Sequence, residues 1–490
     1  MILDDSELKK TYDQAYDLIC GESEENDTEG AKQMLVLAEQ GYAPAMRVCG
    51  HCYMNGWGVA HDEEKAFYWY NAAAEAGDEE GQYNLGMCYF FGEGTEQDPN
   101  AAFNWMYKAA ESGNTAAQLF VGMMYANGDG TDQNDEKAFY WIKKAAEAGN
   151  VVAQGKLGVY YLQGVGTEEN EEEGFKYLKA AADAGDIQSM YNIGVCLLNG
   201  LGTSVDYEKA ANFLFSAAEA GEKDAMEYVV DRIDILKDYL VQYAQRNDLP
   251  EDAQEQFKVA FEDYKEDPDK AIEVFARLGS QGHSDSRNMM ATHFYSHFDP
   301  PEMKSMNYWL LLQAASGEKK AMDILAVHYS LGAGIEKNEE EAFQLKKRNY
   351  ELHPDDPDVK MTLALAYIDG QGGHRDFEKG VRMLKETAES GYPTAQERYG
   401  FLLLHIKHDS RQALYWLERA LSNGYAPAEK SIGLARQEVA KADRRIALNE
   451  RKIQLENEYA NLRGLFTGKR RREIEEAIYS INKQLEELNR

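Results

Sequence analysis

Two short strings in the sequence have the residue types of reactive or metal-binding sites. Cys49-Gly50-His51-Cys52 spaces two thiols as the active site of a thiol–disulfide oxidoreductase does. His293 and His297 are four residues apart, and on a helix this spacing can present two imidazoles to zinc. No glutamate follows His293 in the arrangement of a zinc protease, and no third ligand is evident. His405 and His408 form a similar isolated pair, so both pairs indicate ordinary helix-surface histidines.

An internal repeat gives the Cys-Gly-His-Cys string a packing explanation. Glycine recurs every 36 residues from residue 41 to residue 221 without a slip. In this register Cys52 corresponds to Cys88, and Gly50 to Gly86. A redox motif needs a strand that leads into a helix, whereas this string lies inside a repeated helix. We therefore expect Cys49 and Cys52 to be packing residues.

Other catalytic patterns are not evident. The Gly-x-Gly loops, such as Gly92-x-Gly94, recur with the repeat and lack the preceding strand of a nucleotide site. No Ser/His/Asp set or pair of carboxylates is distinguishable among the 85 acidic residues. We expect no enzyme, no cofactor and no metal site.

Charge and composition restrict the partners and the compartment. The net charge is −33, and it is concentrated in residues 1–424, because residues 425–490 carry three more basic than acidic side chains. An acidic body repels phosphate backbones, so nucleic acid is an unlikely partner. The start, MILDDSELKK, has no pattern of a signal peptide, and no apolar run reaches the ~18 residues of a membrane span. Five cysteines indicate no disulfide framework, so we expect a reducing, cytoplasmic setting.

Each repeat reads as two short antiparallel helices separated by glycine. Gly77 and its equivalents follow the second helix, where a left-handed residue favours glycine. Gly86 and its equivalents lie inside the first helix, so we expect a close helix–helix contact there. One column of the repeat holds small residues, namely Ala45, Gly81, Ala117, Ala153, Ser189 and Ala225. Another holds large aromatic residues, namely Trp69, Trp105, Trp141, Tyr177 and Phe213.

Segments such as LGMCYFFGEG and EKAFYWIKKAAEAGN closely resemble the Sel1-like repeat, a relative of the tetratricopeptide repeat. Residues 31–222 resemble it strongly and residues 269–435 more loosely. The resemblance implies an all-α fold, a right-handed α-α superhelix that mediates protein–protein contacts as an adaptor. It implies no chemistry.

The pattern divides the chain into four parts. Residues 1–228 form a first repeat array, and residues 269–424 a second, degenerate one. Residues 229–268 are the junction, which begins with one longer helix in EYVVDRIDILKDYLVQYAQ and is either rigid or flexible. Residues 425–490 combine a long helix with a C-terminal helical hairpin or coiled coil.

The C-terminal helices leave one apolar stripe in need of a partner. Leu448, Leu455, Tyr459 and Leu462 lie on one side of the long helix, and Val439, Ile446 and Ile453 lie nearly opposite. The last helix can cover only one side. The other side needs the solenoid's own end, a partner protein or a second copy, and we favour a homodimer through residues 436–490.

Two surfaces are candidates for partner binding. The hairpin tip combines apolar and basic side chains, namely Leu465, Phe466, Lys469, Arg470, Arg471 and Arg472. The first helices of the repeats would line a concave, apolar groove with an acidic rim, which suits an amphipathic helix or peptide with basic flanks. Its candidate contact residues are Arg47, His51, Met54, Tyr83, Met87, Phe90, Leu119, Met123, Tyr191 and Val195.

These surfaces support two functions. The first is a non-catalytic scaffold or adaptor that binds its partner in the concave groove. The second is a regulatory subunit or effector that acts through the basic hairpin on an enzyme, a membrane surface or a nucleic acid.

Overall fold

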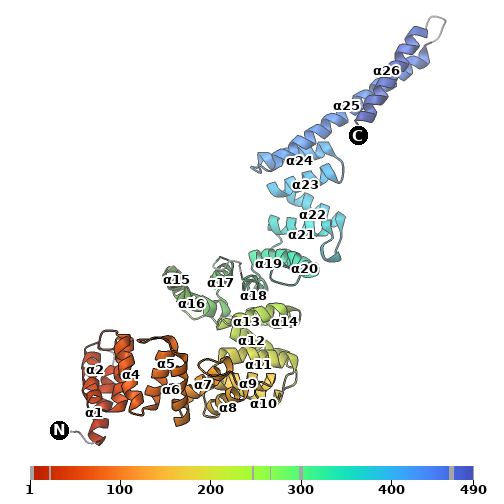
Figure 1. Ribbon diagram of the computed structural model, residues 1–490. Helices are drawn as coiled ribbons and strands as arrows, with labels where there is room; N and C mark the ends of the chain where they lie inside the picture. The colour runs from red at the N-terminus through yellow and green to blue at the C-terminus, as the bar shows by residue number, and fades with distance from the viewer. Residues whose placement is uncertain are drawn as a thin grey trace. The chain divides into compact units, whose positions relative to one another are not determined.

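The computed structural model describes residues 5–20, 24–245, 248–264, 266–296, 302–462 and 468–488. All regular structure in these ranges is helical, as expected from the sequence (Figure 1). The chain divides into two compact units, residues 1–286 and 287–490, which are treated separately below. None of the helices in the described ranges is both long and apolar enough to cross a lipid bilayer.

The regular part of the first unit is a stack of helix pairs (Figure 1). Two helices precede the regular repeats, α1 (Asp5–Ile19) and α2 (Glu24–Glu39). Five pairs follow: α3 (Ala43–Asn55) with α4 (Glu63–Glu75), α5 (Glu79–Phe91) with α6 (Pro99–Ser112), α7 (Thr115–Asn127) with α8 (Asp135–Glu147), α9 (Val151–Gln163) with α10 (Glu171–Asp183), and α11 (Ile187–Asn199) with α12 (Tyr207–Glu219). Ten helices with nearly constant bounds confirm the predicted two-helix repeat.

Recurring caps fix where these helices begin and end. Before α6, the carboxylate of Asp98 accepts hydrogen bonds from the N–H groups of Asn100 and Ala101, which have no partner within the helix. After α5, Gly92 has φ +79, the left-handed conformation that glycine adopts without strain. Each cap recurs with the 36-residue period, so the helix lengths recur as well.

Glycines inside the first helices allow the two helices of a pair to approach closely. A Cβ built on Gly86 of α5 would lie 2.6 Å from Met106 Cγ and 3.3 Å from the carbonyl oxygen of Ala102 in α6. The corresponding Gly122 of α7 meets Ile142 of α8 in the same way. These contacts confirm that the conformational cost of a helical glycine is offset by close packing.

A second glycine brings neighbouring repeats into backbone contact. Gly94, in the loop after α5, has φ +68, and a Cβ on it would collide with the carbonyl group of Glu63. Glu63 is the first residue of α4, in the preceding repeat. The loop of each repeat therefore rests on the start of the second helix of the repeat before it.

The first unit ends in less regular helices. These are α13 (Lys223–Asp231), α14 (Ile233–Ala244), α15 (Ala253–Asp263) and α16 (Pro268–Ser280). The single long helix expected after residue 226 is instead two helices, because the chain breaks at Arg232 (φ −116, ψ 22). Leu236 and Leu240 of α14 are buried, so this break lets α14 turn its own apolar face inward.

The second unit repeats the two-helix pattern less regularly. Its helices are α17 (Ser284–Ser296), whose first residues belong to the first unit, α18 (Met303–Ala315), α19 (Lys319–Leu331), α20 (Glu339–Leu352), α21 (Pro357–Asp369), a 3₁₀ turn (Gln371–Gly373), α22 (Phe377–Glu389), α23 (Pro393–His405) and α24 (Ser410–Ser422). Trp309 of α18 is fully buried and Trp416 of α24 nearly so. The aromatic column of the first unit thus continues in the second.

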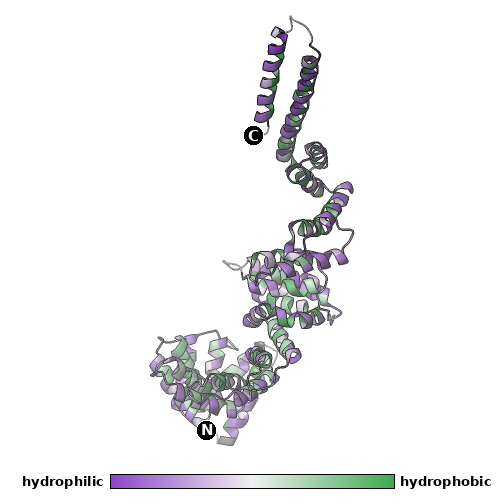
Figure 2. Ribbon diagram, turned by 90° about the vertical axis from the view of Figure 1, so that its right-hand side faces the viewer, coloured by the Kyte–Doolittle hydropathy of each residue, from purple (hydrophilic) through white to green (hydrophobic). Residues whose placement is uncertain are grey.

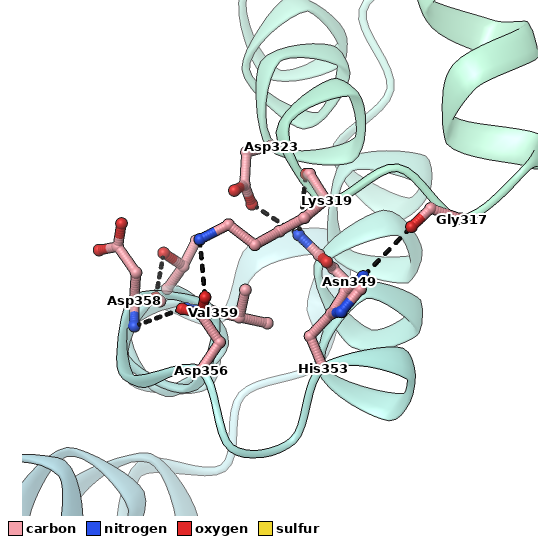
Figure 3. A network of polar contacts seen from close by, with 9 residues as sticks. Gly317, Lys319, Asp323, Asn349, His353, Asp356, Asp358 and Val359 are labelled. Atoms are coloured by element: carbon pink, nitrogen blue, oxygen red, sulfur yellow. Dashed lines mark hydrogen bonds and ion pairs between the residues drawn. The ribbon is translucent and has the colours of Figure 1, made fainter. Parts of the chain in front are cut away.

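A polar network replaces the repeat-ending glycine between α20 and α21 (Figure 3). Asp356 caps α21 by accepting hydrogen bonds from two backbone N–H groups, and it pairs with Lys319 at 2.8 Å. His353 Nε2 lies 3.1 Å from the carbonyl oxygen of Gly317, which implies that the imidazole donates this hydrogen bond. The two helices α20 and α21 therefore form here although the repeat-ending glycine is absent.

Residues beyond 424 form the predicted helical hairpin. The 34-residue α25 (Ala428–Asn461) lies antiparallel beside α26 (Gly468–Glu487) (Figures 1 and 2). Leu455 packs against Ile474 and Ile481, and all three are buried. Both helices are mainly hydrophilic on their outer faces, unlike the mixed helices of the repeats (Figure 2). The hairpin is held by a narrow apolar seam.

Two glycines with the same backbone strain test the role of the loop contact. Gly77 (φ +86) has no neighbour within 4 Å, whereas Gly94 (φ +68) faces the Glu63 carbonyl. We expect Gly77→Ala to lower the free energy of unfolding by ~1–2 kcal/mol, the cost of a left-handed alanine. Gly94→Ala should cost about 3 kcal/mol or more, because the backbone of two repeats must also separate. Urea unfolding followed by circular dichroism compares them; equal losses would contradict a structural role for the loop contact.

Candidate functional site

The candidate groove residues lie on the first helices of the repeats and are mostly half-buried. Of the ten, Leu119 alone is buried; the other nine keep part of their side chains exposed. In the same columns Gly155 and Leu198 are also buried. The structure thus closes part of this surface as core. We call the partly exposed side chains of these columns the first-helix face.

Aromatic and sulfur-containing side chains link the first-helix face across repeats. The rings of Tyr83 in α5 and Phe120 in α7 meet edge to face, with centroids 5.8 Å apart. Burial raises the pKa of the Tyr83 hydroxyl. Met87 and Phe90 pack beside Tyr83 against the buried core of α6 and α7. These residues form a continuous apolar surface with an exposed outer edge.

Arg47 is the basic member of this face and is paired within the chain. Its Nε lies 3.1 Å from Asp78 Oδ1, and its Nη1 lies 2.7 Å from Glu80 Oε2. Asp78 also caps α5 by accepting a hydrogen bond from the N–H group of Gly81. The guanidinium of Arg47 therefore joins the first repeat to the cap of the second.

His51 is held as a neutral imidazole. Asn84 Nδ2 lies 3.5 Å from Nε2, and the Tyr70 hydroxyl lies 2.9 Å from Nδ1. With the Asn84 amide nitrogen facing Nε2, the neutral tautomer that carries its proton on Nδ1 and donates to the Tyr70 hydroxyl satisfies both contacts. Burial first, and the charge of Arg47 second, lower the pKa of His51 to about 4. The negative charge of Asp78 opposes this shift but is the weakest of the three effects, so the imidazole stays neutral.

The Cys-Gly-His-Cys string has the environment of packing residues. Cys49 and Cys52 are both buried, with exposed fractions of 1%. Burial raises the pKa of the Cys49 thiol, and it raises the pKa of Cys52 to about 11. A reactive thiol has the opposite shift, because the thiolate is the nucleophile. The prediction that these residues serve packing agrees with this geometry.

The histidine pairs are not brought into a metal site in the described ranges. His293 lies on α17, while His297 falls outside the described residues. The ring of His405 lies against Phe401, with centroids 4.2 Å apart. No group of three or more histidine, cysteine or acidic side chains within the described residues is arranged to hold a metal ion.

The hairpin tip uses two of its four basic residues internally. Arg470 pairs with Glu458 at 2.8 Å and with Glu473 at 3.1 Å. Arg471 donates a hydrogen bond to the carbonyl oxygen of Leu462. Lys469 and Arg472 are exposed. Leu465 and Phe466, the apolar candidates at this tip, lie outside the described residues.

One of the two predicted stripes on α25 is covered by α26 and the other is exposed. Leu448, Leu455 and Tyr459 belong to the seam with α26. Ile446 and Ile453, on the opposite side, are 49% and 56% exposed. Val439 precedes them at the same seven-residue spacing and is half-buried. Within the described residues, this stripe is an apolar surface without a covering helix.

Comparison of the sequence with family patterns gives eight matches to the Sel1 repeat. They cover residues 43–78, 79–114, 115–150, 151–186, 187–222, 319–345, 362–392 and 393–425, which is more than half of the chain. Sel1 and tetratricopeptide-like repeats are typically protein-interaction scaffolds without catalytic activity. The search of curated proteins gave no significant match.

Solved structures similar to this chain include two of the same repeat class. One is c5321, a protective antigen of uropathogenic Escherichia coli with an SLR fold; it is 25% identical, with 88% of each chain covered and a TM-score of 0.44. Another is a Sel1 repeat protein from Oxalobacter formigenes, which is 26% identical over 46% of this chain and 90% of its own, with a TM-score of 0.43. The immunity protein Pa5087 of Pseudomonas aeruginosa is 19% identical over 46% of this chain and 84% of its own, with a TM-score of 0.30.

The neutral state of His51 should make the stability of the folded chain depend on pH. Because its pKa is lowered from 6.5 to about 4, the unfolded chain binds a proton between these values that the folded chain does not. Stability should therefore fall as the pH falls from 6.5 toward 4, by about 2 kcal/mol at pH 5. NMR of ¹³C-labelled histidine should show one imidazole with a pKa about 4 that disappears in His51→Gln. A His51 signal that titrates near 6.5 would contradict the burial argument.

Proposed function

We propose that this chain, which belongs to the Sel1 repeat family, is a non-catalytic scaffold that binds a protein partner along its first-helix face. The observation that carries this proposal is the row of half-buried Tyr, Met and Phe side chains on that face, linked from repeat to repeat. Aromatic and methionine side chains are enriched in the cores of protein interfaces: aromatic rings supply contact area at low entropic cost, and methionine adapts its shape to the partner. The buried thiols and the neutral His51 offer no catalytic group beside it.

We further propose that the partner is an amphipathic helix or an extended peptide with basic flanks. The net negative charge lies entirely in residues 1–424, so a basic partner is attracted and an acidic one repelled. Arrays at residues 1–228 and 269–424 would present two such surfaces, joined by residues 229–268. The same acidic surface disfavours nucleic acid. Five cysteines free of disulfides suit a reducing, cytoplasmic setting.

We propose a second role for the hairpin, which is to join two copies of the chain. Val439, Ile446 and Ile453 repeat every seven residues, as the core positions of a coiled coil do. In a parallel pair of α25 helices, Arg445 of one copy, which also donates to the carbonyl oxygen of Leu488 in its own chain at 3.3 Å, would lie near Glu450 of the other, an attractive flanking pair. The hairpin is also the part of the chain where the net charge is not negative, so it is where two copies repel each other least.

The alternative, an effector that acts through the basic hairpin, has less support. The internal pairs of Arg470 and the carbonyl contact of Arg471 leave two of the four tip cations for a partner. A membrane surface or nucleic acid recognised by charge alone needs a larger cluster, since each basic residue contributes about 1 kcal/mol at a membrane.

Charge placed on the first-helix face should weaken partner binding. Met87→Lys and Phe90→Lys put a cation where a basic-flanked peptide would dock, and we expect at least a tenfold loss of affinity. Partners recovered by affinity purification would be expressed, purified and titrated against each variant by calorimetry. Tyr68→Lys is the matched control, because Tyr68 lies on α4 and is 62% exposed. Unchanged affinity in the first two variants, with folding intact, would overturn the groove proposal.

Light scattering tests the hairpin dimer. We expect the wild-type chain of 55.3 kDa to have twice that mass in solution. Ile446→Asp with Ile453→Asp should restore the monomer mass, because two charges would be buried between copies. Tyr479→Asp, on a 74% exposed residue of α26, should leave the dimer intact. A monomer mass for the wild-type chain would contradict this proposal.

A further inference from the structure

One position of the first-helix face departs from the repeat and leaves a pocket. The residue that begins this face is large in four repeats and glycine in one. It lies 34 residues before a small residue of the next repeat. The pairs are Arg47/Gly81, Tyr83/Ala117, Leu119/Ala153, Gly155/Ser189 and Tyr191/Ala225. In the pair Gly155/Ser189 the first residue has no side chain, and the second is the one residue of its column that has a polar side chain.

The geometry shows that these two departures meet. A Cβ built on Gly155 would collide with Ser189 Oγ and would lie 3.2 Å from Asp186 Oδ2. Gly155 belongs to α9, while Asp186 and Ser189 belong to the cap and first turn of α11 in the next repeat. The absence of a side chain at residue 155 therefore lets the Ser189 hydroxyl and the cap of α11 approach α9 closely.

A pocket of about 220 Å³ lies at this place. It is lined by Gly155, Val159, Tyr160, Asp186, Ser189 and Asn192, among others. This volume is several times the ~30 Å³ that one water occupies in the liquid. Val159 belongs to the first-helix face, so the pocket opens within the surface proposed above for partner binding.

The floor of the pocket holds a polar group with an unmet hydrogen bond. Ser189 is 1% exposed, and its Oγ has no hydrogen-bond partner within the described residues. Asp186 Oδ2 accepts a hydrogen bond from the N–H group of Ser189 at 2.8 Å. The ion pairs of the described residues do not include Asp186, although a carboxylate can accept several hydrogen bonds. A buried hydroxyl and a carboxylate are thus available to one donor.

The equivalent site of the first repeat shows which side chain can occupy the Gly155 pocket. Three repeats earlier, Arg47 stands at the position of Gly155, and its guanidinium reaches Asp78 at 3.1 Å and Glu80 at 2.7 Å. Asp78 is the cap that corresponds to Asp186, and Glu80 corresponds to Gln188. At the intervening caps the chain has Asn114 and Asn150, which carry no charge. A carboxylate returns at Asp186, where the face position is glycine, and at Glu222, where Tyr191 fills that position.

We infer that the Gly155 pocket receives an arginine side chain of the partner, whose guanidinium pairs with Asp186 and donates to Ser189 Oγ. This inference rests on the proposed function and specifies one anchor of the peptide. A guanidinium supplies five N–H donors in a planar fork, so it can reach both oxygens at once. Lys156 lines the rim and is exposed, so its charge is largely solvated, whereas that of Asp186 is partly buried.

A displayed library of random dodecapeptides, panned against the full chain, tests the pocket directly. We expect the selected peptides to share one arginine. Replacing it with citrulline, which keeps the shape and removes the charge, should weaken binding about 10- to 100-fold, as measured by fluorescence anisotropy. Asp186→Asn should cause a similar loss while keeping the cap, because asparagine caps α7 and α9.

A pocket-filling variant provides the matched control. Gly155→Leu with Ser189→Ala reproduces the Leu119/Ala153 pair of the preceding repeat, so it should fold and should bind the peptides at least tenfold more weakly. Circular dichroism checks whether the pocket-filling variant folds. If it does not fold, the affinity of Asp186→Asn for the peptides tests the pocket instead.

The outcomes separate this inference from the proposed function. Peptides that lose affinity for Met87→Lys but bind the filled pocket as tightly as wild type would overturn the arginine pocket and leave the groove standing. Peptides indifferent to both variants, or no enriched peptide, would count against both.

Discussion

The contact between the backbones of neighbouring repeats is the constraint on which the array depends. The loop glycine after each first helix, such as Gly94, lies against the carbonyl group that begins the second helix of the preceding repeat. No side chain fits between them, so any residue other than glycine separates the two repeats. The second unit keeps the same contact, where Gly334 lies against Met303. A solenoid has no central core, and its stability is the sum of such interfaces between neighbours.

This constraint determines which residues are available for function. Glycines, alanines and the aromatic column are fixed by contacts that every repeat must make. The residues of the first-helix face and of the hairpin's exposed stripe are not fixed by such contacts, because their side chains end at the surface. Differences between repeats therefore carry more information about function than the repeated residues do. Gly155 with Ser189 is one such difference, and the charged cap Asp186 beside them is another.

The sequence predicted the repeat well because one residue type recurs at each cap and each close contact. It did not predict the break at Arg232, since the segment around it has continuous helical spacing without glycine or proline. The sequence predicted two apolar stripes on α25, but not which of them α26 covers, because both stripes have heptad spacing. The packing of Leu455 against Ile474 in the structure identifies the covered stripe. The pocket was also missed. Gly155 and Ser189 are 34 residues apart, and the repeat register alone does not show that they touch.

Polar residues at core positions can serve either the fold or a ligand, and their hydrogen bonds distinguish the two. Lys346 occupies the core column that holds Met106 and Ile142 in the first unit. Its Nζ donates to Gln371 Oε1 at 2.6 Å, and Gln371 Nε2 donates in turn to Glu339 Oε2 at 2.7 Å. The cost of burying this ammonium is thus offset within the chain. Ser189 is a neutral hydroxyl, whose burial costs less than that of an ammonium, but it has no hydrogen-bond partner among the described residues. In the proposed complex, the arginine of the partner would supply the hydrogen bond that the chain itself does not give to Ser189 Oγ, so burial of this hydroxyl would favour binding rather than folding.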